Sequence, residues 1–219
     1  MCTTFTFAHE GNKYELGTAS HCVSGDLPAG LQFGVVFDET SKKEYPAKVV
    51  AVGGIDSEVG DAAVVEIETT DTLPVVPLSY EEVQAGDPTF YVGGADALGK
   101  QLYYGTVSAP KVNLPKTEGG VGAPGGWNDV LLTESAGGPG ASGSGVRSAK
   151  TGNFIGILVG RPPQGEGIVI VVRIEQLRAL YFNCKYGTKM PNSTCGPVLG
   201  TLPLTSGIDK IRKILELLP

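Results

Sequence analysis

The chain has 219 residues, of which 41% are hydrophobic and 18% charged, and its net charge at neutral pH is −6. This composition excludes a disordered chain, and the acidic charge without a basic stripe argues against nucleic acid as a partner. No apolar run reaches the roughly 18–20 residues that cross a bilayer, and no signal peptide is visible after Met1. The 32 glycines and 15 prolines favour an all-β fold with many tight turns.

The first third of the chain has the pattern of short β-strands. Residues 3–8 alternate, the turn EGNK follows, and YELGTAS completes a hairpin that ends at His21 and Cys22. LQFGVVFD, YPAKVVAVGG and DAAVVEIE predict further strands, the last beginning at Asp61. The prolines of TLPVVPLSY then break the pattern. We therefore predict an N-terminal β-barrel over residues 1–75 that carries His21 and Asp61.

A second group of strands predicts another barrel over residues 76–183, which carries Ser142. Its expected strands are TFYVGG, QLYYGTVSA, NDVLLTES, NFIGILVG and GIVIVVRI. Helical spacing of apolar residues is confined to 174–182 and 207–218. Residues 184–219 are predicted to form a C-terminal extension with a disulfide loop and a helix.

The four cysteines form an early pair, Cys2 and Cys22, and a late pair, Cys184 and Cys195. None has a CxxC spacing and the chain has only two histidines, so no metal site is expected. Two local disulfides are the simplest interpretation and would place the protein in an oxidising compartment. Four buried free thiols in a cytosolic or viral protein remain the alternative.

Three residues suggest nucleophilic catalysis when they are taken together. Alone, His21 is more often structural, Asp61 is an ordinary strand-start residue, and Ser142 in GGPGASGSGV belongs to a Gly/Ser linker. In chain order, however, with gaps of 40 and 81 residues, each lies at a strand end or in a loop, and Ser142 is embedded in G-x-S-G. A serine hydroxyl needs an imidazole to accept its proton, and a carboxylate orients that imidazole. The N–H groups of Gly140 and Ser142 are the candidate oxyanion donors, and no cofactor is implied.

The motifs TASHC, DAAVV and GASGSG resemble the histidine, aspartate and nucleophile motifs of trypsin-like serine proteases. The bacterial streptogrisin and alpha-lytic branch is the most similar, and the resemblance spans about residues 2–182. It implies two perpendicular six-stranded antiparallel β-barrels with the active site in the cleft between them. It also implies a disulfide between Cys2 and Cys22.

The chain departs from the family pattern at several positions. Ala141 stands where the family usually has Asp, Gly145 replaces a proline, and Val159 stands where a serine often bonds the catalytic aspartate. Relatives have one more strand before Cys2, so either the first barrel lacks an edge strand or the C-terminal extension covers that edge.

The resemblance also places the substrate-binding residues, which are Ala136, Gly137, Gly138, Val159, Gly160 and Arg161. The pocket floor then contains no acid, so a small or apolar side chain before the scissile bond is the default. Arg161 could instead favour an acidic residue, unless Glu134 neutralises it.

These observations predict a secreted or extracellular serine endopeptidase, a monomer that acts on proteins or peptides. Its activity should rise as His21 deprotonates near pH 6–7. Two alternatives remain: an inactive binding or adhesion domain on the same fold, and an intracellular viral polyprotein protease with reduced cysteines.

Overall fold

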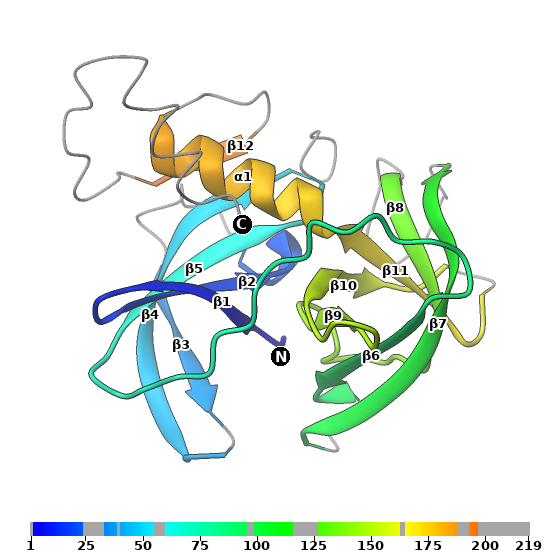
Figure 1. Cartoon of the computed structure of the whole chain (residues 1–219). Helices are drawn as coiled ribbons and strands as arrows, with labels where there is room; N and C mark the ends of the chain where they lie inside the picture. Colours follow the sequence, from blue (N-terminus) through cyan, green and yellow to red (C-terminus); the bar gives the residue numbers. More distant parts are fainter. Residues whose placement is uncertain are drawn as a thin grey trace.

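The computed structural model describes residues 2–23, 33–38, 40–54, 60–95, 99–115, 127–162, 165–187 and 193–196. Within these residues the chain forms two antiparallel β-sheets that lie side by side, with one α-helix across their upper edge (Figure 1). The expectation of an all-β fold with a short helical addition is therefore confirmed at the level of two sheets and one helix.

The first sheet has six strands in the described residues, and the closed barrel predicted for this part of the chain is not confirmed. Its hydrogen-bonded order is β1-β2-β5-β4-β12, and β3 pairs with the first half of β4. β12 pairs with the last residues of β4, so the C-terminal extension supplies a strand to this sheet. The strands are β1 Phe5–Glu10, β2 Lys13–Thr18, β3 Phe33–Asp38, β4 Lys43–Gly53, β5 Ala63–Glu68 and β12 Ser193–Cys195.

The second sheet closes into the predicted six-stranded barrel, in the order β10-β11-β8-β7-β6-β9. Sequence patterning missed β9, because it is short and begins within the glycine-rich stretch 137–146. The strands are β6 Pro88–Gly93, β7 Gln101–Leu114, β8 Trp127–Glu134, β9 Gly145–Ser148, β10 Phe154–Gly160 and β11 Ile168–Arg173.

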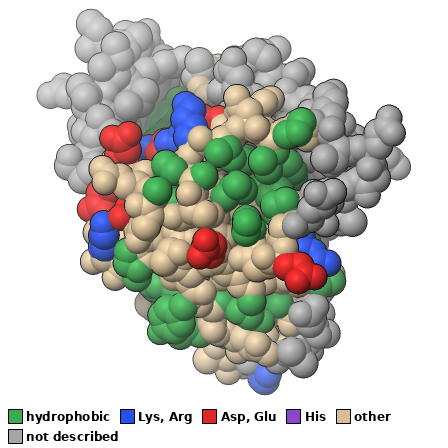
Figure 2. All heavy atoms as spheres, turned by 90° about the vertical axis from the view of Figure 1, so that its right-hand side faces the viewer, with side chains coloured by type: hydrophobic (Ala, Val, Ile, Leu, Met, Phe, Trp, Pro, Cys, Tyr) green, Lys and Arg blue, Asp and Glu red, His purple; other side chains and the backbone are tan. Residues whose placement is uncertain are grey.

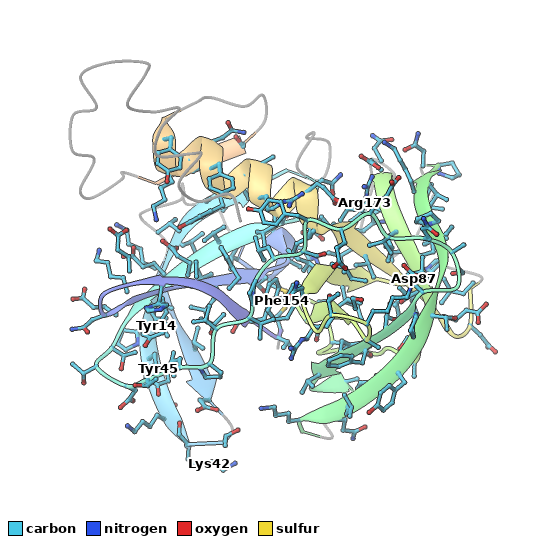
Figure 3. All side chains as sticks on the ribbon, viewed as in Figure 1. Tyr14, Lys42, Tyr45, Asp87, Phe154 and Arg173 are labelled. Carbon is cyan, nitrogen blue, oxygen red and sulfur yellow. A yellow bond between two sulfur atoms is a disulfide. The ribbon has the colours of Figure 1, made fainter. Side chains whose placement is uncertain are left out.

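A shared hydrophobic core holds the two sheets together. The Phe5 ring on β1 and the Phe154 ring on β10 have centroids 4.2 Å apart, and Phe154 lies between the sheets in Figure 3. The same core contains Val64 of β5 and Ile157 of β10, both fully buried. Each sheet also has an apolar cluster of its own. Because side chains of both sheets form one core, the ends of the strands at this junction are held in fixed relative positions.

Helix α1, Ile174–Tyr186, confirms the helix predicted over 174–182 and extends it. Its buried Leu177 and Leu180 pack into the shared core. The helix ends at Gly187, whose left-handed φ of 74° lets its N–H bond the carbonyl of Asn183. The helix predicted over 207–218 lies outside the described residues, and the division into three regions stays a prediction.

One face of the second barrel carries several hydrophobic side chains. Figure 2 shows hydrophobic side chains gathered on it, with few charged groups among them. Leu102 and Tyr104 of β7 are among the exposed hydrophobic residues of the chain. In the part of the chain that the structure describes, no helix has both the length and the apolarity needed to cross a membrane.

Candidate active site

His21 lies in a short 3₁₀ turn, Ser20–Cys22, directly after β2. The apolar alternation of β2 buries Leu16 and fixes the strand in the sheet, so its end carries the turn to the junction of the two sheets. The His21 side chain is 31% exposed, which leaves part of the imidazole accessible to a bound substrate.

Asp61, at the start of the segment that enters β5, lies next to His21. Its carboxylate is fully buried, and Oδ2 lies 2.5 Å from His21 Nδ1. The backbone N–H of His21 donates to Oδ1 at 2.8 Å. These contacts fix the imidazole with Nδ1 toward the acid. The hydrogen bond to Asp61 raises the pKa of His21, against the opposing effect of burial.

A residue that sequence reasoning overlooked completes this arrangement. The hydroxyl of Ser20 donates to Asp61 Oδ1 at 2.5 Å, and both side chains are buried. Val159, in the position where the family often supplies a serine, is instead buried in the shared hydrophobic core. The available signal was the serine immediately before His21 in TASHC, but nothing in the sequence indicated where its hydroxyl points.

The glycine-rich stretch 137–146 is a hydrogen-bonded turn between β8 and β9 and not a linker. The N–H of Ala141 donates to Gly138 O at 3.0 Å, and the N–H of Ser144 donates to Ala141 O at 3.0 Å. Gly140 has a φ of +99°, and a Cβ there would lie 2.4 Å from the Gly94 carbonyl oxygen, so only glycine fits. Ala141, the departure from the family motif, is fully buried in the core of the second barrel.

Ser142 is partly exposed at the tip of this turn, and a short bridge connects it to His21. Its carbonyl accepts the N–H of Thr3 at 2.7 Å. Cys2, next to Thr3, forms a disulfide with Cys22, next to His21. Among the described residues, no hydrogen bond joins the Ser142 hydroxyl to His21. Catalytic hydrogen bonds are often long before substrate binds and tighten in the complex.

The predicted substrate-binding residues border this turn. Ala136 is exposed, Gly137 and Gly138 are half-buried, and the Tyr91 hydroxyl donates to the Ala136 carbonyl. Val159 is buried, whereas a Cβ on Gly160 would meet no atom within 4 Å of it.

Arg161 is exposed, and within the described residues it forms no ion pair with Glu134. The sequence left open whether Glu134 neutralises this arginine, and the structure gives no ion pair that would do so.

All four cysteines are paired, Cys2 with Cys22 and Cys184 with Cys195, so the alternative of four free thiols is wrong. The sulfur atoms of the first pair lie within 4.8 Å of a ring nitrogen of His21, but the disulfide occupies both sulfurs. This cluster is therefore not a metal site in the oxidised protein.

Two sheets with a histidine–carboxylate pair at their junction are compatible with a serine protease. A family model described as the trypsin-like peptidase domain matches residues 2–157, and the chain belongs to this family. No curated protein sequence matches the chain.

The fold is also similar to those of several solved proteases. A serine endoprotease from Yersinia pestis is 20% identical, with a TM-score of 0.58, covering 82% of this chain and 56% of that one. The HtrA-type protease AlgW with a decapeptide is 23% identical, with a TM-score of 0.63 and coverages of 85% and 52%. Rv3671c from M. tuberculosis H37Rv, in an inactive form, is 16% identical, with a TM-score of 0.64 and coverages of 87% and 83%. The chain thus spans about half the length of the first two, and membership of the streptogrisin and alpha-lytic branch stays a prediction.

Proposed function

We propose that the chain is an endopeptidase in which Ser142 is the nucleophile, His21 the general base and acid, and Asp61 the orienting carboxylate. The observation that carries this proposal is the 2.5 Å contact between His21 Nδ1 and the fully buried Asp61 carboxylate. A buried acid beside an imidazole selects the tautomer with its proton on Nδ1 and leaves Nε2 free to accept a proton.

In the proposed reaction Ser142 Oγ attacks the carbonyl carbon of the scissile peptide bond while His21 Nε2 takes the hydroxyl proton. The tetrahedral intermediate collapses when the same proton passes to the leaving amine, which gives an acyl-enzyme and a free amino terminus. Water, deprotonated by His21, then hydrolyses the ester and restores Ser142. The charge that forms on His21 is stabilised by Asp61 throughout.

The N–H groups of Gly140 and Ser142 are the proposed oxyanion donors. Neither donates to any acceptor in the described part of the chain. The turn that contains them is held by the hydrogen bonds at Ala141 and Ser144, so both amides need little reorganisation. Loss of one such donor costs about 100- to 1000-fold in turnover.

For the residue that precedes the cut, we propose a small or medium apolar side chain. A Cβ on Gly137 would lie 2.7 Å from Val169 Cγ1, so Val169 packs closely against the predicted pocket floor. The Tyr91 ring is 98% buried below it, and its hydroxyl is engaged by the Ala136 carbonyl. Such a floor offers no charge to pair with Lys or Arg. The competing proposal is an acidic residue before the cut, whose charge would pair with Arg161.

The two disulfides favour an oxidising location, and we therefore propose that the protein works outside the cytoplasm. Proteins or peptides as substrates follow from the proposed reaction.

Labelling with a fluorophosphonate tests the nucleophile, because this reagent phosphonylates an activated serine irreversibly. We expect one adduct on Ser142 by peptide mass mapping and none in Ser142→Ala. Ser144→Ala is the matched control, since Ser144 is two residues away, fully buried and expected to be unreactive. A folded protein that takes up no label would identify the inactive binding domain instead.

A peptide library that varies the residue before the cut tests the pocket. We expect cleavage after Ala or Val to exceed cleavage after Lys or Arg. Preferred cleavage after Asp or Glu, lost in Arg161→Ala, would replace the apolar preference with the acidic one.

A further inference from the structure

Thr3 makes three hydrogen bonds between the first sheet and the glycine-rich turn 137–146, which carries Ser142 and is called the nucleophile turn below. Its hydroxyl donates to the Gly140 carbonyl at 3.0 Å, and its N–H donates to the Ser142 carbonyl at 2.7 Å. Its own carbonyl accepts the hydroxyl of Thr18 at 2.8 Å. One residue near the amino terminus therefore holds the carbonyl groups of Gly140 and Ser142, the two residues on either side of Ala141.

The fit around Thr3 is close on the side of the turn. A Cβ on Gly143 would lie 2.0 Å from the Thr3 carbonyl oxygen and 2.3 Å from the Thr18 hydroxyl. Gly143 has a φ of +87° and donates its own N–H to the Leu158 carbonyl at 2.7 Å. The backbone of the turn at Gly143 thus packs directly against the backbone of Thr3. A shift of Thr3 therefore moves the backbone of the turn.

Thr3 is itself fixed at both ends. Thr18, which anchors its carbonyl, is the 99% buried last residue of β2. On the other side, the disulfide of Cys2 leads to Cys22 and the turn that carries His21. The turn that carries His21 and the nucleophile turn are therefore both attached to the segment Cys2–Thr3, although the two turns belong to different sheets.

Building on the proposed function, we propose that Thr3 is a positioning residue for catalysis, whose hydroxyl fixes the Gly140 carbonyl and so orients the backbone of Gly140 and Ser142, the two residues whose N–H groups are the proposed oxyanion donors. Thr3 does not contact substrate in this role. Its hydroxyl fixes the direction of the Gly140 carbonyl, and its N–H fixes that of Ser142. Donors aligned in advance matter most in the tetrahedral state, where the negative charge develops, and less in the substrate complex.

The test compares Thr3→Val, which keeps the shape and the backbone N–H but removes the hydroxyl, with Thr3→Ser, which restores it. We expect kcat of Thr3→Val to fall about tenfold with KM nearly unchanged, since a misplaced oxyanion donor affects the transition state selectively. Affinity for a peptide boronic acid, which forms a tetrahedral adduct on the serine, should fall by a similar factor. Thr3→Ser should recover most of both losses.

Thr89→Val is the matched control, because Thr89 is a buried threonine on β6, outside the site. If Thr3→Val matched the wild type in kcat and boronic acid affinity, the positioning role would be disproved. Equal losses in kcat in Thr3→Val and Thr3→Ser would also disprove it, since the hydroxyl would then not be the active group. Should Thr3→Val fail to fold, Thr18→Val, which loosens Thr3 from its other end, must reproduce the loss in kcat. A wild-type protein that takes up no fluorophosphonate would overturn the proposed function itself, which separates the two failures.

Discussion

At the scale of single residues, the environment of Asp61 decides the chemistry of the site. A buried carboxylate is costly unless donors surround it, and here three donors do so, from the Ser20 hydroxyl, the His21 backbone and the His21 ring. The chain supplies the hydroxyl from the residue before the histidine, whereas Val159 contributes only hydrophobic packing.

Removal of the Ser20 hydroxyl should therefore destabilise the protein. We expect Ser20→Ala to lower the free energy of unfolding by about 1.5–3 kcal/mol, the cost of deleting a buried hydrogen bond to a charged group. Urea denaturation at pH 7 measures this change in the free energy of unfolding. Ser108→Ala, at an exposed serine, is the control. Equal effects of the two substitutions would contradict the role assigned to Ser20.

The pH dependence of the proposed activity should follow His21. Because the hydrogen bond to Asp61 raises the pKa of His21, kcat/KM should rise with a midpoint above the ordinary value near 6.5. The raised pKa also means that protonated His21 stabilises the fold below that ordinary value, and that this contribution is lost as pH rises through the folded pKa.

Asp61→Asn should shift the midpoint downward and lower kcat by orders of magnitude. Rates of peptide hydrolysis between pH 5 and 9 measure both effects. An unchanged midpoint in the variant would show that Asp61 does not set the pKa of His21.

At the scale of elements, helix α1 lies over a charged part of the first sheet. Glu15 of β2 is opposite Glu66 of β5, and one Glu15 carboxylate oxygen is buried without a hydrogen-bond partner. Burial raises the pKa of Glu15 to about 7, partly offset by Lys185 of α1. The other charged and titratable groups that act here are Lys13, Glu66, Glu10 and Tyr181.

Packing of α1 on this sheet should consequently depend on pH. The protonated form of Glu15 is favoured in the folded protein, so its stabilising contribution is complete below pH 4.5 and is lost as pH rises to about 7. Glu15→Gln removes this dependence and should be more stable than the wild type at pH 8, by on the order of 3 kcal/mol. Thermal denaturation at pH 4 and pH 8 tests it. If Glu15→Gln changed the melting temperature by the same amount at pH 4 and at pH 8, the prediction would be contradicted.

At the scale of the whole molecule, the C-terminal part of the chain returns to the first sheet. Cys184 on α1 is bonded to Cys195 on β12, and β12 pairs with β4. The bond spans 11 positions of sequence, far from the nucleophile turn in the chain.

We expect the double variant Cys184→Ala, Cys195→Ala to lose about 3 kcal/mol of stability by the loop-closure argument, while fluorophosphonate labelling of Ser142 keeps its rate. Chemical denaturation and labelling kinetics measure the two quantities separately. Slower labelling in the folded variant would mean that the extension affects the active site.

Local pattern was sufficient for most strands, for helix α1 and for the choice of His21, Asp61 and Ser142 as candidates. Alternating burial along β4, for example, follows directly from its alternating sequence. Strand β12 was not predictable in this way. A three-residue strand shows almost no periodicity in sequence. Its pairing depends on where the preceding helix ends in space.

By itself, then, the sequence determined the residue types, their order and the strands that carry them, because these depend on neighbours along the chain. The partners of Asp61 and Gly140 were decided only by the tertiary structure. The Ser20 hydroxyl meets a carboxylate 41 positions away, and the Thr3 hydroxyl meets a carbonyl 137 positions away. Such bonds form because a shared core brings two sheets together and so fixes which polar groups meet at their junction.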